Sequence, residues 1–178
     1  MALLFTTGLA VRVVAASLIA GAAVVSDLRT RRIPNALTFG GAAAALAFAF
    51  ASSGLAGLGT SAAGWLLGAT LFFPFFALRG MGAGDVKLLA AIGAWLGPWQ
   101  VLWVAIFACM AGGVLAIVVS LAHGYLKTAF KNIWLIFTHW RVSGVQPVPG
   151  LTLTDAAAPR LAYAVPVAVG LMVTLWRR

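Results

Sequence analysis

Long apolar segments alternate with short polar ones along the whole chain, a pattern typical of a protein that crosses a membrane several times. A helix needs about 20 apolar residues to span a bilayer. Six segments have this character, although only the first and fifth reach that length: 3–25, 36–51, 62–78, 86–96, 101–121 and 161–176. The pattern predicts an all-α polytopic membrane protein with about six transmembrane helices, forming a single domain over residues 1–178.

Two of these segments leave open how they lie in the membrane. The fourth, 86–96, is short, so it either begins inside the membrane or continues through Gly97 and Pro98 as a kinked helix. The first, 3–25, resembles a cleaved signal peptide in its small residues. It lacks a basic start and its apolar stretch is too long, so we expect a retained helix.

The composition excludes several classes of protein. With 63% hydrophobic and 8% charged residues, the chain is neither an ordinary soluble enzyme nor a disordered protein. A net charge of +9 would suggest nucleic acid binding in a soluble protein. Here the basic loops are expected to face anionic membrane lipid instead, with no nucleic acid partner. We expect Trp95, Trp99 and Trp103 to anchor helices at the membrane interface.

The basic residues also predict an orientation. With six crossings, loops 26–35 and 79–85 and the long segment 122–160 fall on one side of the membrane. That side, together with the adjoining helix ends, carries nine Lys and Arg residues. This bias predicts that they face the cytoplasm. Within 122–160, residues 125–140 carry apolar side chains at helical spacing. That stretch is either a helix lying in the membrane interface or an extension of the fifth span.

Only three acidic residues occur in the chain, and two of them are predicted to meet. Asp27 follows the first span and Asp85 precedes the fourth, and two crossings between them return the chain to the same face. Ionisable groups at membrane depth are costly and usually functional. Two neighbouring carboxyls cannot both ionise easily, so one activates water while the other, protonated, polarises a peptide carbonyl. This is the chemistry of an aspartic protease.

Glycines surround Asp85 in the run GMGAGDVK at 80–87. Gly82 and Gly84 allow a backbone path closed to other residues and a close approach by another chain, as a substrate strand would need. Lys87 is a candidate for contact with a substrate carboxylate. His123 and His139 stand apart from other metal-ligating residues, so we expect no metal and no cofactor.

Two stretches together resemble the active-site regions of the type IV prepilin peptidases. Segment 80–97 contains Gly82-Ala83-Gly84-Asp85, which matches the GxGD signature shared with presenilin and signal peptide peptidase, and segment 26–38, SDLRTRRIPNALT, is similar to the family's first region. Segment 161–166 resembles the entry to its last span. The resemblance is closest to the short form found with tight-adherence (Flp) pili, because the paired CxxC motifs associated with N-methylation do not occur here. We therefore expect no methyltransferase activity.

The resemblance implies an aspartic endopeptidase of the bacterial inner membrane that removes the leader from prepilin-like substrates at the cytoplasmic face. Asp27 and Asp85 carry over as the catalytic pair, and Gly82 and Gly84 as loop glycines. Arg29, Pro34, Asn35 and Lys87 also match motif positions. Two alternatives stay open: a transporter or channel in which the aspartates relay protons or cations, and a structural membrane subunit of a secretion machine.

Overall fold

The computed structural model describes residues 2–148, 150–151 and 162–177, with side chains from Gly8 onward. The described residues form helices and no strands, as the sequence predicts. Their order is α1 (Ala2–Thr30), α2 (Asn35–Ala77), α3 (Ala83–Leu96), α4 (Pro98–Ala122), α5 (Leu126–Ser143) and α6 (Ala164–Trp176). Three helices are long and apolar enough to cross a membrane, namely Gly8–Thr30, Asn35–Ala77 and Pro98–Ala122. The chain is therefore an integral membrane protein.

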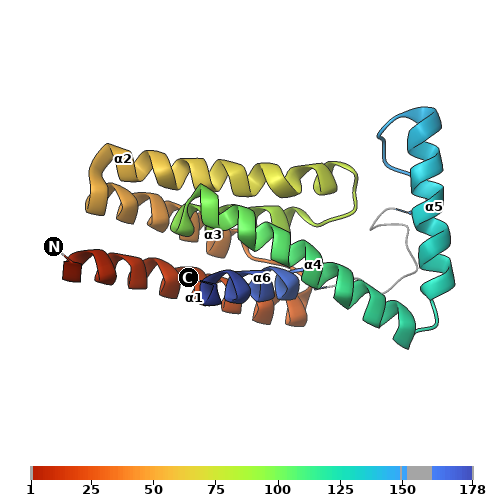
Figure 1. Ribbon diagram of the computed structural model, residues 1–178, viewed down its shortest axis with the longest axis horizontal. Coiled ribbons are helices and arrows are strands. Elements are labelled where there is room, and N and C mark those ends of the chain that lie inside the picture. Colours follow the sequence, from red (N-terminus) through yellow and green to blue (C-terminus); the bar gives the residue numbers. More distant parts are fainter. Residues whose placement is uncertain (1, 149, 152–161, 178) are drawn as a thin grey trace.

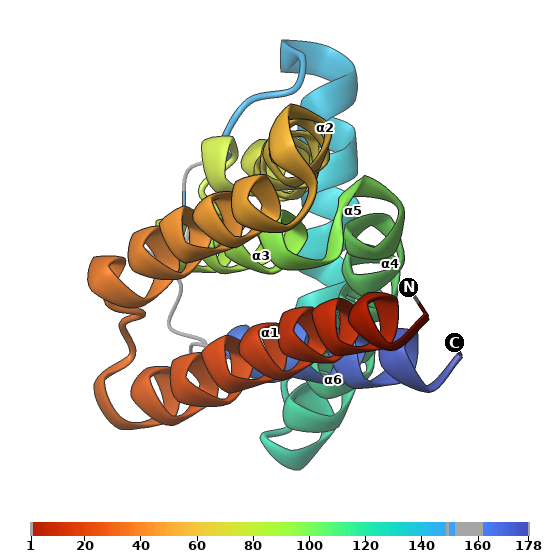
Figure 2. The same cartoon turned by 90° about the vertical axis from the view of Figure 1, so that its left-hand side faces the viewer.

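The helices other than α5 run roughly along one axis and form a bundle (Figure 1). The end of α1, the start of α2, the start of α3, the end of α4 and the start of α6 gather at one end of this bundle. Viewed from the other end, α1 and α6 lie beside each other on one side, and α2 covers another (Figure 2). The predicted alternation of crossings thus places both acidic motifs at the same end.

The second and third predicted spans are joined more tightly than the sequence suggests. We expect a loop at 52–61, but α2 remains helical on both sides of a single residue, Gly54, where the chain folds back. Gly54 has φ +60° and ψ −147°, a conformation that glycine adopts without the steric cost of a Cβ. One residue is therefore enough to reverse the chain, and the two arms of α2, 35–53 and 55–77, lie antiparallel.

The fourth predicted span, α3, is a separate helix and not the first half of a kinked one. Gly97, with φ +86°, ends α3, and Pro98 then begins α4. Proline is well suited to the first turn of a helix, where its missing N–H has no partner to lose. The chain turns back at this point, so α4 runs against α3 (Figure 1).

Helix α3 is the centre of the bundle, and its closest neighbour is α2. A Cβ on Gly68 would lie 2.6 Å from the Leu89 carbonyl oxygen, and a Cβ on Gly64 or Gly93 would lie even closer to the other's carbonyl oxygen. Contact between the helix backbones fixes where α3 lies.

Trp95 of α3 is only 7% exposed, and the centroid of its ring lies 5.8 Å from that of the Phe48 ring. The expectation that Trp95 anchors a helix at the membrane interface is therefore wrong.

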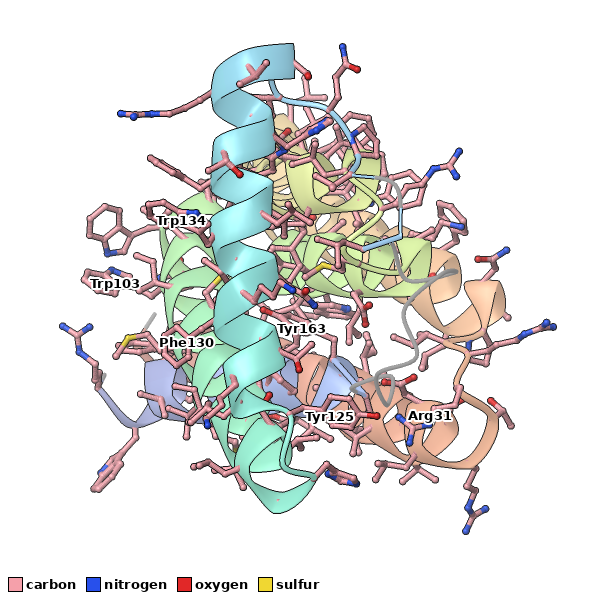
Figure 3. The ribbon with its side chains drawn as sticks, turned by 90° about the vertical axis from the view of Figure 1, so that its right-hand side faces the viewer. Arg31, Trp103, Tyr125, Phe130, Trp134 and Tyr163 are labelled. Carbon is pink, nitrogen blue, oxygen red and sulfur yellow. The ribbon has the colours of Figure 1, made fainter. Side chains whose placement is uncertain are left out.

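Helix α5 is separated from α4 by residues 123–125 and lies across the bundle axis (Figure 1). The alternative that this segment extends the fifth span is therefore wrong. No side chain of α5 is buried. Figure 3 shows Phe130 and Trp134 projecting from it, and they are 65% and 68% exposed. An exposed apolar face on a crosswise helix fits the predicted interfacial position, which stays a prediction.

Candidate active site

Asp27 lies in the last turns of α1, inside the bundle. Asp27 is only 8% exposed, and its carboxyl oxygen Oδ2 accepts a hydrogen bond of 3.3 Å from the backbone N–H of Ala164. This donor comes from the first residue of α6, which is far away in the sequence. A buried carboxyl is costly without a hydrogen-bond partner, so the start of α6 compensates in part for the burial of Asp27.

Asp85 lies in the first turn of α3, directly after the glycine-rich turn. The turn bends the chain so that the Asp85 N–H donates to the Gly82 carbonyl at 3.2 Å, while the backbone of Gly82 hydrogen-bonds with the Asp85 carboxyl. The charge of Asp27 acts on Asp85, so the two carboxyls share one electrostatic environment. The structure therefore brings together the two acids that the topology argument pairs.

The two motifs also contact each other directly at this end of the bundle. A Cβ on Gly84 would lie 3.2 Å from Cβ of Ile33, in the link between α1 and α2. The Lys87 ammonium donates to Oδ1 of Asn35 at 3.0 Å and lies 5.1 Å from the centre of the Phe39 ring. Lys87, predicted as a substrate contact, thus ties the second motif to the first, and its role toward substrate stays a prediction.

The link between α1 and α2 is held by hydroxyl groups at the end of α1. Ser26 Oγ donates to the Arg32 carbonyl at 2.8 Å, and Thr30 Oγ1 donates to the Ser26 carbonyl at 2.9 Å. The bond to the Arg32 carbonyl reaches past the end of the helix and helps to fix the chain that leads to Ile33. The polar residues of the first motif therefore shape the turn that carries Ile33 to Gly84.

Sequence reasoning did not place Ala164 and Tyr163 in this site. Ala164 contributes only its backbone N–H, which no side-chain pattern reveals. Tyr163 precedes α6, and the charge of Asp85 acts on it. The resemblance of segment 161–166 to a span entry was the available signal; Leu161 itself lies outside the described residues, as does Asp155.

Within the described residues, no three or more His, Cys, Asp or Glu side chains form a group. The expectation that the protein needs no metal stays a prediction. His123 hydrogen-bonds through Nδ1 with the Val119 carbonyl one turn earlier, at the end of α4. The chemistry available at this end of the bundle is that of two carboxyls, each with a main-chain hydrogen-bond partner.

Comparison with known proteins agrees with this arrangement. The model of the type IV leader peptidase family matches residues 13–117, which include both aspartates. A prepilin leader peptidase/N-methyltransferase of Burkholderia pseudomallei (strain 1026b) is 38% identical over 113 residues, 59% of this chain and 35% of the relative. One from Aeromonas hydrophila is 45% identical over 83 residues, 43% of this chain and 28% of the relative.

The chain spans about a third of the length of these curated relatives. No solved structure matches it. The family model nevertheless covers more than half of the chain and contains the whole region in which the two motifs meet. On this evidence, the chain belongs to the type IV leader peptidase family.

Proposed function

We propose that this protein is an intramembrane aspartic endopeptidase that removes the leader from prepilin-like substrates. The observation that carries the proposal is the contact between the two motifs that hold Asp27 and Asp85, at one end of the helix bundle. The relatives' name, prepilin leader peptidase/N-methyltransferase, supports a leader peptide as substrate. Membership in the family supports the peptidase class.

In the proposed reaction, the two carboxyls hold one proton between them and a water molecule lies beside both. The ionised carboxyl takes a proton from the water, while the protonated one donates a hydrogen bond to the scissile carbonyl. The water oxygen bonds to the carbonyl carbon, and a proton then passes to the leaving nitrogen as the C–N bond breaks. One water is consumed, and the pair of carboxyls ends with one shared proton, as it began.

The glycines beside Asp85 support this role. A Cβ on Gly82 would lie 3.2 Å from Oδ2 of Asp85, so any larger residue there would crowd the carboxyl. A Cβ on Gly84 would likewise crowd the side chain of Ile33. We propose that this open path allows an extended substrate segment to reach Asp85, which a helix-bound peptide bond could not do.

The charges at this end of the bundle support a cytoplasmic active site. Arg29, Arg32 and Arg79 are exposed around the two motifs. Basic loops remain on the cytoplasmic side of bacterial membrane proteins. We therefore propose that the protein lies in the inner membrane and that the leader is cut at its cytoplasmic face.

The test uses the full chain purified in detergent and a prepilin peptide with a basic leader followed by an apolar helix. Asp27→Asn and Asp85→Asn should each lower the cleavage rate by about 10²–10⁴-fold, the usual contribution of an acid or base. Asp155→Asn, which removes the other carboxyl of the chain, is the matched control and should cleave normally. Near-normal cleavage by either dyad variant would refute the proposal. Ion flux through proteoliposomes without any cleavage would favour a transporter.

A further inference from the structure

Tyr163 lies at the start of α6, near the proposed catalytic pair, and contacts residues of α2 and α4. It is the last residue before α6 and is followed by Ala164, whose N–H donates to Asp27. The charge of Asp85 acts on the Tyr163 side chain. Figure 3 looks onto this end of the bundle and shows Tyr163 near its middle. The tyrosine is thus linked to one aspartate through its own backbone and to the other through space.

The Tyr163 side chain is fixed by contacts with α2 and α4. Its ring meets that of Phe72 edge to face, with centroids 5.7 Å apart and planes at 76°. Its hydroxyl hydrogen-bonds with the Cys109 side chain of α4. Phe72 is 1% exposed, so the ring rests on a part of the core that cannot easily move. These contacts determine where α6 begins.

The space for the ring is opened by Gly112. A Cβ at this position would lie 2.9 Å from both Cε2 and the hydroxyl oxygen of Tyr163. The next residue, Gly113, has nothing within 4 Å of the corresponding point. The two adjacent glycines of α4 therefore differ in contact with the tyrosine, since Gly112 is buried against its ring and Gly113 is exposed.

A role as a simple interface anchor does not account for these contacts. An anchoring tyrosine keeps its hydroxyl in the polar headgroup layer. The hydroxyl of Tyr163 faces a thiol, and its side chain is half-buried. Tyr125, the other tyrosine of the chain, is 42% exposed and shows the contrasting case.

We propose that Tyr163 is a positioning residue of the active site, which locks the start of α6 so that the Ala164 N–H stays on the Asp27 carboxyl. The inference rests on the proposed function of Asp27 and Asp85 as the catalytic pair. Loss of the lock would let Asp27 move relative to Asp85 in the resting enzyme. Catalytic geometry is sensitive to such movement, since a displacement of about 1 Å can cost about 10²-fold in rate.

The experiment compares Gly112→Ala with Gly113→Ala in the full chain in detergent, with the prepilin peptide as substrate. Gly112→Ala should lower kcat by about 10–100-fold with KM changed less than about twofold, because the ring must move away from the new methyl group. Gly113→Ala should match the wild type. Tyr163→Phe, which keeps the ring and removes the hydroxyl, should lower kcat by about 3–10-fold, an estimate for one hydrogen bond. Tyr125→Phe is its control.

Two further measurements separate positioning from a general loss of folding. Hydrogen exchange at the Ala164 amide should be faster in Gly112→Ala than in Gly113→Ala, whether or not substrate is present. Combining Gly112→Ala with Tyr163→Ala should cost no more than the larger single effect, because both changes act through one contact.

The inference is overturned if the two glycine variants have equal kcat and equal Ala164 exchange. It is also overturned if Tyr163→Phe raises KM and leaves kcat unchanged, since the tyrosine would then bind substrate. These failures differ from failure of the proposed function, in which the wild-type chain itself does not cleave or Asp27→Asn cleaves normally.

Discussion

Replacing Gly68 with alanine should push α3 away from α2 and disturb the helix that carries Asp85. A Cβ at Gly68 would lie 2.6 Å from the Leu89 carbonyl oxygen and 2.9 Å from Cα of Ala90. An ordinary C···O contact is about 3.3–3.6 Å, so the two backbones must separate by about 0.7–1 Å. Neither contact atom belongs to a flexible side chain, and the strain cannot be relieved by rotation of a side chain.

The cost of this overpacking can be estimated. Forcing an extra carbon into a packed core costs about 1–3 kcal/mol, and alanine regains about 0.5–1 kcal/mol through its better helix propensity. The net loss is about 0–2.5 kcal/mol, and a loss near the middle of this range, about 1 kcal/mol, corresponds to a Tm lower by about 2–4 °C in a chain of this size. Because Leu89 lies one turn after Asp85, we also expect the cleavage rate to fall by about 10–100-fold.

The assay is thermal unfolding in detergent, followed by circular dichroism, together with the cleavage rate on the prepilin peptide. Gly59→Ala is the matched control, because Gly59 lies in the same arm of α2 and has nothing within 4 Å of its would-be Cβ. The control should unfold at the wild-type temperature or slightly above it. If Gly68→Ala has the same Tm and rate as Gly59→Ala, backbone contact between α2 and α3 does not position Asp85.

Two further predictions concern the contact between the motifs and the chemistry of the site. Lys87→Met and Asn35→Ala should each lower the free energy of unfolding by about 0.5–1.5 kcal/mol, and the double variant should lose no more than the larger single effect, because both remove the same 3.0 Å hydrogen bond. Additive losses in chemical denaturation would contradict this. Cleavage should be unchanged in excess chelator, since two carboxyls and water suffice for the proposed reaction; activity that returns only with added metal would show that prediction to be wrong.

The meeting of Asp27 and Asp85 at one end could be predicted from the sequence because it depends only on the number of crossings between them. An even number returns the chain to the same side, whatever the details of packing. The expected loop at 52–61 was wrong for a local reason. Alanine, leucine and glycine in this stretch continue the helix on both sides, and the reversal needs only the backbone freedom of Gly54.

Contacts between segments far apart in the sequence could not be predicted by counting crossings. The hydrogen bond from Ala164 to Asp27 uses a backbone N–H, which every residue except proline carries, so no residue type marks it in advance. The burial of Trp95 was missed for a related reason. An apolar segment has the same pattern whether lipid or other helices surround it, and only the packing of α3 between its neighbours decides which applies.

The central position of α3 has a consequence for how the protein is made. At 14 residues, α3 is too short to cross a bilayer by its own hydrophobicity, and its contacts with α2 replace those that a longer helix makes with lipid. During synthesis it must therefore enter the membrane against the already inserted arms of α2. The hydrogen-bond partner of Asp27 arrives later still, with α6. A nascent chain that ends before α6 holds both carboxyls but lacks this bond, so we expect the enzyme to be inactive until α6 has been synthesised and has joined the bundle.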